Sequence, residues 1–486
     1  MAAEGIIGID VGTTSVKAAV LDGDGAFVAR YSQGFETVRR APNIVEQDPD
    51  TWVRLVDAAL EGFAGHRVVA MGLCSQVNTH VFVDTGGEPL CPAIQWQDGR
   101  AAAEAATLDA RVTRGQKQAW WGAPMPIDAS HAIARMAWMA RHHPDIWART
   151  RWVMLPKDYC LYKLTGVAST DPLSNIGLVD GDLRYIPQVL DLVPGAADRM
   201  APIVGPTEVV GQVAQGPFTG VPVVSGAMDA WAGLVGAGGA CERSTIYLSG
   251  TSEILGISSR SVVPTPGAIV FPECAGVRVH AAPTQNGSDS QSWFCALAGL
   301  TLDEMSRMVG ETPRSAATPL FLPQLEGERA PLWDADLRGA FLGVGRGTTL
   351  PDMARAVYEG VAFAARHALE TVQASGDLRS DVISCGGGGF RSDPWTQIRA
   401  DVLGTALRPL AVGEPGIVGA ATLAAIGIGQ FDDIATASTA LARYGPVRYP
   451  DEDAAARMDA VFAIYKQAIG ANAQIGKDLG RIAWQG

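Results

Sequence analysis

Two aspartates in this chain directly follow apolar runs, where a carboxylate could do chemistry. Asp10 ends the run "GIIGID", and Asp229 follows "VPVVSGAM" and precedes a stretch of small residues. In an α/β protein the carboxyl ends of strands are where ligands bind. A carboxylate there can accept a proton from a hydroxyl or attract a divalent cation. Each aspartate could instead do no more than cap its own backbone or the helix that follows.

The residues after Asp10 form a candidate anion-binding turn. Gly12, Thr13 and Thr14 separate two apolar runs, and a tight turn of this composition exposes backbone N–H groups and hydroxyls together. Such a nest binds oxyanions, phosphate above all. Asp10 would repel phosphate directly, but it would attract the Mg²⁺ that accompanies phosphate, through water. An ordinary hairpin turn is the alternative.

The same pattern returns in the second half of the chain. When Gly250 in "STIYLSGTSEILGIS" is set on Gly12 of the opening hairpin, Leu248 falls on Asp10. The hairpin therefore recurs without its carboxylate. A repeat at half the chain length indicates two similar domains with a boundary near 240. Two such turns facing one another would hold a polyphosphate between the domains.

A glycine run supplies the third candidate site. Gly386 to Gly389 follow an expected strand over 382–385, and Asp393 and Pro394 are expected to be the N-cap and first residue of the next helix. Glycines let a flat or charged ligand approach the backbone closely. Adenine and ribose are the natural guests. A second glycine-containing stretch, "GVGRGT" at 343–348, is interpreted as a loop.

Asp229 is the candidate general base. It stands between an apolar strand and a small-residue helix. A carboxylate placed against a hydroxyl could accept its proton as the oxygen attacks a γ-phosphate, an effect of roughly 10²–10⁴-fold in rate.

The elements that must position these residues alternate between strands and helices. Apolar runs at 5–11, 15–21 and 26–32, separated by turn residues, predict a β-meander. A helix is expected from Asp48-Pro49, and "HRVVAMGLCS" predicts a central strand. Helical patterns dominate from about 100 to 200, and the tail after about 430 indicates a loop and a final amphipathic helix. The fold class is α/β.

The bulk properties exclude several partners. The chain has 486 residues and a formal net charge of -13, which argues against nucleic acid as a partner. Its seven cysteines are scattered and lie mostly in apolar runs, which favours buried thiols in a reducing compartment. No basic leader or apolar run of ~20 residues is seen, so a cytoplasmic protein without a membrane partner is expected.

Eight segments, in order from about residue 5 to 430, resemble the FGGY carbohydrate kinases. They are "GIDVGTTSVKAAVLD", "PAIQWQDGR", "LPKDYCLYKLTG", "STDPLSNIGLVD", "GAMDAWAGLVGAG", "LSGTSE", "LEGERAPLWDADLRGAFLG" and "GGGGFRSDPWTQIRADVLG". The resemblance implies two actin-like (ribonuclease H-like) domains with an interdomain catalytic cleft. Residues 1–240 would bind sugar and carry the first phosphate turn and the base, and residues 241–486 would bind the nucleotide. ATP and Mg²⁺ are the implied cofactors, and a homodimer is suggested by family analogy alone.

Matching residues to the family's motifs assigns roles by position. Asp10 matches the metal-side aspartate and Asp229 the catalytic base. The nucleotide-binding residues implied in the same way are Thr13, Thr14, Lys17, Gly250, Thr251, Gly387, Gly388 and Ser392.

The substrate is less sharply indicated. "GLCSQVNTHVFVD" aligns with the sugar-facing segment, where Val77-Asn78 replaces both the Met-His pair of xylulokinase-like members and the Arg-Glu pair of glycerol kinase-like ones. Asn78 can donate and accept hydrogen bonds, so it suits a hydroxyl or carbonyl. Gln76, Asp128 and Asp229 are the other expected substrate contacts. Trp96, Trp231 and His80 could face a sugar or belong to the core.

The segment order is closest to xylulokinase-like members, so a ketopentose such as D-xylulose is the expected acceptor. Another ketose, a polyol such as erythritol, or a sugar acid stays open, because Val77-Asn78 is not the family's pair and Ala230 follows the base where an amide is usual. A more remote alternative is an ATP-gated binding module of the actin or chaperone type. A degenerate, regulatory member would be expected to have lost one of Asp10, Thr13, Thr251 or Asp229.

Overall fold

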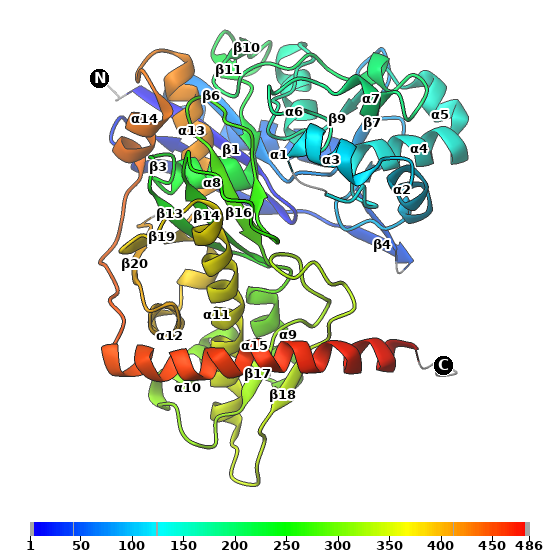
Figure 1. Cartoon of the computed structure of the whole chain (residues 1–486). Coiled ribbons are helices and arrows are strands. Elements are labelled where there is room, and N and C mark those ends of the chain that lie inside the picture. Colours follow the sequence, from blue (N-terminus) through cyan, green and yellow to red (C-terminus); the bar gives the residue numbers. More distant parts are fainter. Residues whose placement is uncertain (1–3, 42, 123–124, 412, 482–486) are drawn as a thin grey trace. The chain divides into compact units, whose positions relative to one another are not determined.

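The computed structural model describes residues 4–41, 43–122, 125–411 and 413–481 (Figure 1). The chain forms two compact units. The first comprises Met1–Ala240, Pro272–Val277 and Pro415–Ala442, and the second comprises Cys241–Phe271, Arg278–Glu414 and Arg443–Gly486. A late segment of the chain therefore belongs to the first unit.

The predicted meander opens the first unit. Strands β1 (Glu4–Val11), β2 (Ser15–Leu21) and β3 (Phe27–Gly34) pair antiparallel in sequence order. Strand β6 (Arg67–Ser75), predicted to be central, pairs parallel with β1 and is buried from Ala70 onward. The apolar runs thus form the centre of the sheet.

Helix α1 (Pro49–Gly62) begins where the sequence predicts. The side chain of Asp48 accepts a hydrogen bond from the backbone N–H of Asp50, and proline occupies the first turn, where its missing N–H costs nothing. Trp52, Val56 and other residues at helical spacing are buried against the sheet.

The sheet of the first unit continues beyond β6. Its order is β10-β11-β6-β1-β2-β3, with β12 pairing with β6 as well. The added strands are β10 (Val209–Gln212), β11 (Pro222–Val224) and β12 (Ala227–Met228). Both β11 and β12 run parallel to β6, so the carboxyl ends of β1, β6 and β12 meet at one edge.

Helix α13 (Pro415–Gly427), from late in the sequence, covers this sheet (Figure 1). A Cβ on Gly8 would lie 2.1 Å from the carbonyl oxygen of Ile417, and one on Gly72 would lie 2.0 Å from that of Ala420. Glycines on β1 and β6 therefore let the helix backbone lie directly on the strands.

A helical part with its own apolar core fills most of the region from 100 to 200. Its helices are α2 (Ala102–Asp109), α3 (Arg114–Trp121), α4 (Ala132–His142), α5 (Pro144–Arg149), α6 (Pro156–Thr165) and α7 (Pro187–Leu190), followed by the short helix Ala197–Arg199. Small sheets flank it, built from β4 (Val38–Ala41), β5 (Ile44–Gln47), β8 (Ala93–Ile94), β7 (Val81–Val83) and β9 (Trp152–Met154).

The second unit repeats the sheet of the first. Its order is β15-β16-β14-β13-β19-β20. The strands are β13 (Thr245–Ser249), β14 (Glu253–Ser258), β15 (Ile269–Val270), β16 (Val279–Pro283), β19 (Val382–Gly386) and β20 (Ala406–Pro409). As in the first unit, three antiparallel strands are extended by parallel ones, so the hairpin repeat seen in the sequence is a repeat of whole sheets.

Helices and a hairpin complete the second unit and its apolar core. They are α9 (Ser288–Ala298), α10 (Leu302–Glu311), β17 (Leu320–Leu322), β18 (Ala340–Leu342), α11 (Leu350–Ser375), the short helix Gly388–Phe390, α12 (Asp393–Leu403) and α15 (Glu452–Arg481). The stretch 343–348 is a loop, as predicted, and α15 is the predicted final helix. Among helices in the described ranges, none has an apolar stretch long enough to cross a membrane.

Two predictions about local structure are wrong. The N-cap of α12 is Ser392 rather than Asp393: the Ser392 hydroxyl accepts the N–H of Trp395, while Asp393 pairs with Arg448. The tail after 430 begins with a further helix, α14 (Ile434–Leu441), and not with a loop. Its capping residue Asp433 accepts the N–H of Thr436, a start signal that the sequence analysis overlooked.

Candidate active site

The sheet register of the first unit brings the two candidate aspartates to one edge. Asp10 on β1 lies opposite Cys74 on β6, and Cys74 lies opposite Ala227 on β12. Asp229 follows two residues after Ala227. Neighbouring strands are about 4.8 Å apart, so this row places both carboxylates within one small site.

Asp229 is the first residue of helix α8 (Asp229–Gly236), and its N-cap is Met228. Within the described residues its carboxylate accepts one hydrogen bond, from the N–H of Ala230 to Oδ1 at 2.7 Å. Burial, together with the negative charge of Asp10, raises the pKa of Asp229 to about 7. A carboxylate with this pKa is well matched to accept a proton near neutral pH.

Asp10 lies under the start of helix α13. A Cβ on Gly416 would lie 3.1 Å from Oδ2 of Asp10 and 3.3 Å from Sγ of Cys74. Burial and the neighbouring carboxylates hold the pKa of Cys74 well above its ordinary value, so its sulfur is a neutral thiol that faces the carbonyl of Gly416 at 3.4 Å. Lys17 lies opposite Asp10 on β2.

The turn after Asp10, the predicted phosphate turn, is stabilised by hydrogen bonds from its own backbone and from Trp96. The N–H of Gly12 donates to the carbonyl of Ser15 at 3.0 Å. The indole N–H of Trp96, which is only partly buried, donates to the hydroxyl of Thr13 at 3.2 Å. Thr14 is exposed at the tip of the turn. Trp96 is therefore a neighbour of the turn rather than a core residue.

Gln76 is buried, and its amide is used within the protein. Its Nε2 donates to the carbonyl of Gly12 at 3.3 Å and to Gln47 at 2.8 Å, and its Oε1 accepts from Thr79 at 3.1 Å. These bonds support a role in holding the turn. Its predicted contact with substrate stays a prediction.

Two other predicted substrate residues come together through a serine. Asn78 Nδ2 donates to the hydroxyl of Ser130 at 3.3 Å, and that hydroxyl donates to Asp128 Oδ1 at 2.7 Å. Asn78 has φ of 55°, a left-handed conformation that asparagine tolerates better than most residues. His80 and Trp231 are buried, which favours the core interpretation for both.

In the second unit, the repeated turn meets the start of helix α9. The N–H of Gly250 donates to the carbonyl of Ser252 at 2.9 Å, so this turn is one residue shorter than the first. The N–H of Ser288, the first residue of α9, donates to the carbonyl of Gly250 at 2.9 Å. Thr251 is exposed beside these groups.

The glycine run packs against the same turn. A Cβ on Gly387, whose φ is 96°, would lie 2.3 Å from the carbonyl oxygen of Ser249, and one on Gly389 would lie 2.1 Å from its hydroxyl. Gly388 is exposed, and a Cβ there would meet no atom within 4 Å. Ser392 bonds to Ser306 and caps α12, so its hydroxyl is already engaged.

Two buried ionic clusters near these residues were not predicted from the sequence. In the second unit, Arg399 pairs with Glu253 at 2.6 Å and donates to the carbonyl of Gly389 at 2.6 Å, joining the turn to the glycine loop. In the first unit, Lys157 pairs with Asp158 and Asp171 and donates to the carbonyl of Ser225. Charged residues inside otherwise apolar segments were the available signal.

The donor set fits a magnesium ion that arrives with phosphate. Within the described residues, no group of three or more His, Cys, Asp or Glu side chains could hold a metal ion. Mg²⁺ commonly takes one or two carboxylates, with phosphates and water completing its shell. Asp10, a single carboxylate beside the turn at the strand edge, suits that mode of binding.

Comparison with known proteins shows which family the chain resembles along its length. The N-terminal domain of the FGGY family of carbohydrate kinases matches residues 5–236, and the C-terminal domain matches residues 247–428. The xylulose kinase of Escherichia coli (strain K12) is 30% identical over 443 residues, 86% of this chain and 89% of that protein.

Solved structures are similar over nearly the whole chain. The xylulose kinase from Rhodospirillum rubrum has a TM-score of 0.85 at 25% identity, covering 97% of this chain and 100% of that one. The gluconate kinase from Lactobacillus acidophilus has a TM-score of 0.87 at 23% identity, covering 97% and 98%, which shows the shared fold. The chain is thus a member of the FGGY family of carbohydrate kinases.

Proposed function

We propose that this protein transfers the γ-phosphate of ATP to a hydroxyl of a sugar, with a ketopentose such as D-xylulose as acceptor. The observation that carries the proposal is Asp229, a carboxylate at the strand edge with a pKa of about 7 and a single hydrogen-bond donor among the described residues. Relatives such as the E. coli xylulose kinase support the choice of acceptor.

In this mechanism Asp229 acts as general base. Its carboxylate takes the proton of the acceptor hydroxyl as that oxygen attacks the γ-phosphorus in line. The bond from the γ-phosphorus to the bridging oxygen breaks, and ADP leaves with the electron pair. The raised pKa of Asp229 makes the carboxylate a stronger base than an ordinary aspartate while leaving a large fraction ionised near neutral pH.

The turns and Asp10 would handle the phosphate charge. Backbone N–H groups and hydroxyls of the turn after Asp10, and those at Gly250-Thr251, would hold phosphate oxygens. Asp10 would hold Mg²⁺ through water, and Lys17 lies across the hairpin from it. When bound, the ion would neutralise charge on the phosphates.

The acceptor would be held by Asn78, Ser130 and Asp128. This cluster offers an amide, a hydroxyl and a carboxylate, which together can donate to and accept from adjacent hydroxyls. Ser130 is an addition to the residues named from the sequence.

Gly387 and Gly388 are proposed to lie against the nucleotide.

The test is ADP release from Mg-ATP with D-xylulose, L-xylulose, D-ribulose, L-ribulose, L-fuculose, glycerol, erythritol, xylitol and gluconate as acceptors. We expect the strongest rate with a ketopentose. Asp229→Asn should lose most of that rate. Its matched control is Asp182→Asn, a change at an exposed loop aspartate of the same unit, which should leave the rate unchanged. A dominant rate with glycerol or gluconate would contradict the proposed acceptor, and silence with every acceptor would contradict the proposed reaction.

A further inference from the structure

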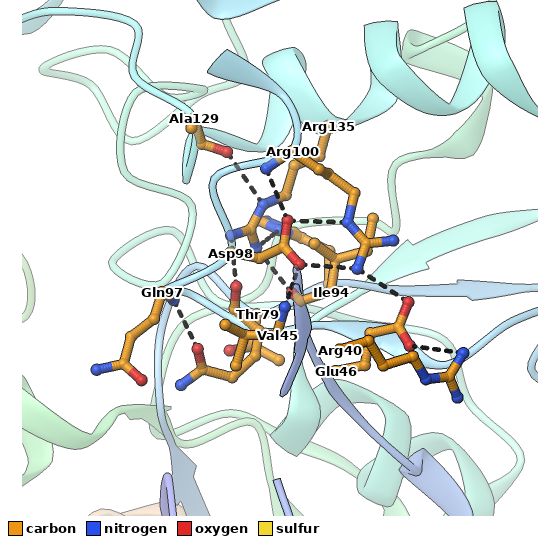
Figure 2. A network of polar contacts seen from close by, with 12 residues as sticks. Arg40, Val45, Glu46, Thr79, Ile94, Gln97, Asp98, Arg100, Ala129 and Arg135 are labelled. Carbon is orange, nitrogen blue, oxygen red and sulfur yellow. Dashed lines mark hydrogen bonds and ion pairs between the residues drawn. The ribbon is translucent and has the colours of Figure 1, made fainter. Parts of the chain in front are cut away.

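A buried arginine, Arg135, donates hydrogen bonds to the backbone carbonyls of Ala129 and Ile94, and Figure 2 shows it beside both residues. Arg135, on helix α4, is fully buried. Its Nε donates to the carbonyl of Ala129 at 3.2 Å, and its two terminal nitrogens donate to the carbonyls of Ile94 at 2.8 Å and Gln95 at 2.6 Å. It also donates to the carbonyl of Asn78.

Each acceptor belongs to a segment with a role in the proposed site. Asn78 carries the amide of the sugar cluster, and Ala129 lies between its other two members, Asp128 and Ser130. Gln95 precedes Trp96, whose indole N–H reaches the hydroxyl of Thr13 in the phosphate turn at 3.2 Å. One guanidinium therefore joins three loops that are far apart in sequence.

The conformation of Asn78 shows why such a contact is needed. Its φ of 55° is a left-handed backbone conformation that costs free energy unless its surroundings hold it. The bond from Arg135 to its carbonyl and the bond from its side chain to Ser130 hold the residue from both sides. A planar guanidinium with donors in a fixed fork suits several carbonyls at once, which a lysine ammonium does less well.

The charge of Arg135 is balanced nearby. Burial lowers the pKa of the Arg135 guanidinium to about 9, and the carboxylates of Asp98 and Asp128 oppose that change, so the group stays charged at neutral pH. Asp98 is held in turn by Arg100, with hydrogen bonds of 2.7 and 2.8 Å (Figure 2). His80, with Nδ1 3.1 Å from Arg135, has its pKa held well below the ordinary value by burial and by this charge, so it is neutral.

We infer that Arg135 is a positioning residue for sugar recognition: it fixes Asn78 and the Asp128–Ser130 turn in the geometry that binds the acceptor's hydroxyls. This inference rests on the proposed function. It concerns affinity and selectivity for the sugar, and not the transfer of the proton, which belongs to Asp229. The hydrogen bonds described for Arg135 go to Asn78, His80, Ile94, Gln95 and Ala129, and none of them goes to a predicted nucleotide-binding residue of either unit.

The test measures KM for sugar and for ATP separately in Arg135→Lys, which keeps the charge but not the fork. We expect KM for the best acceptor to rise about tenfold or more while KM for ATP changes less than about twofold. Ser130→Ala, a change at a partly exposed residue, should also raise KM for sugar. Arg399→Lys is the matched control: an equally buried arginine of the second unit, expected to raise KM for ATP instead.

The outcomes separate the two claims. If none of the acceptors stimulates ADP release by the wild-type protein, the proposed function is contradicted, and the proposed role of Arg135 is contradicted with it. If the wild type is active and Arg135→Lys lowers thermal stability without a selective rise in KM for sugar, the arginine is structural only and the inference is overturned. Equal rises in both KM values in Arg135→Lys would also overturn the inference. A selective rise in KM for sugar in Arg135→Lys, together with a selective rise in KM for ATP in Arg399→Lys, would support it.

Discussion

At the scale of single residues, the site depends on where one carboxylate is placed. Asp229 could have been an ordinary helix cap, but the structure makes Met228 the N-cap and leaves Asp229 with one donor among the described residues. Burial and Asp10 together make its ionised form costly. The same features that favour proton acceptance should therefore reduce the stability of the folded chain.

Asp229→Asn should raise stability in a pH-dependent way. Because the folded-state pKa of Asp229 is raised from 3.8 to about 7, the folded chain holds this proton more tightly than the unfolded chain does. The contribution of the carboxyl to stability therefore falls as pH rises from about 4 to about 7 and is constant above. Thermal unfolding should therefore show that the stability of the variant relative to the wild type increases across that pH range. A gain that is the same at pH 4 and pH 8 would contradict the shifted pKa, and Asp182→Asn is the control for a solvent-exposed carboxylate.

Gly388→Ala separates ligand contact from folding. A Cβ there meets no protein atom within 4 Å, so thermal unfolding should be unchanged within about 0.5 kcal/mol. If the nucleotide lies against this glycine, KM for ATP should rise several-fold while KM for sugar does not. Gly389→Ala is the contrasting variant, because its Cβ would lie 2.1 Å from Ser249 Oγ and stability itself should fall. An unchanged KM for ATP in Gly388→Ala would remove this residue from the nucleotide site.

At the scale of elements, helix α13 packs closely on α8, the helix that begins at Asp229. A Cβ on Gly419 would lie 1.7 Å from the carbonyl oxygen of Ala232, and one on Gly236 would lie 2.0 Å from that of Pro415. The two helices therefore contact each other through their backbones. Since α8 begins at Asp229, a change in this contact should shift the Asp229 carboxylate.

Gly419→Ala should cost about 1–3 kcal/mol of stability, the range for an overpacked core, and should lower kcat more than it changes either KM. The matched control is Gly470→Ala on α15, where a Cβ meets no atom within 4 Å. That variant should be neutral, or more stable by up to about 1 kcal/mol, because alanine favours helix over glycine. Chemical denaturation compares the two. Equal effects would show that the helix contact does not constrain the site.

The sequence predicts the elements better than it predicts their contacts. The meander, the central strand β6, helix α1 and the repeated hairpin are confirmed because alternation, apolar runs and capping residues are local signals. The burial of Arg135 was not predicted, because no local sequence signal distinguishes a buried arginine from an exposed one on an amphipathic helix. Ser392 and Asp393 compete for one capping position, and only the geometry of Asp393 with Arg448 decides between them.

At the scale of the whole molecule, the chain closes its first unit with a late segment. Residues 415–442 return to a sheet formed by the first 240 residues, and that return could not be predicted because α13 is apolar on all sides and carries no mark of its partner. The need for glycine at Gly8 and Gly72 becomes clear only from the structure, where the backbone of α13 lies against both residues.

A fragment of residues 1–240 should therefore fail to form a cooperative fold. Without α13, the face of β1 and β6 that it covers would be exposed, and apolar residues such as Ile417 and Leu423 would be missing from the core. Fusing residues 415–442 to the fragment should restore a cooperative thermal transition. The measurement is near-UV circular dichroism with temperature. Cooperative unfolding of residues 1–240 alone would contradict this view of the first unit.

The most direct test of the central claim is the product formed from ATP and D-xylulose, followed by phosphorus NMR in wild-type protein and in Asp229→Asn. We expect a new phosphomonoester signal that grows with ADP in the wild type. In the folded variant, we expect that rate to fall by roughly 10²–10⁴-fold. An undiminished phosphomonoester signal in Asp229→Asn, or ADP accompanied only by inorganic phosphate in the wild type, would contradict the central claim.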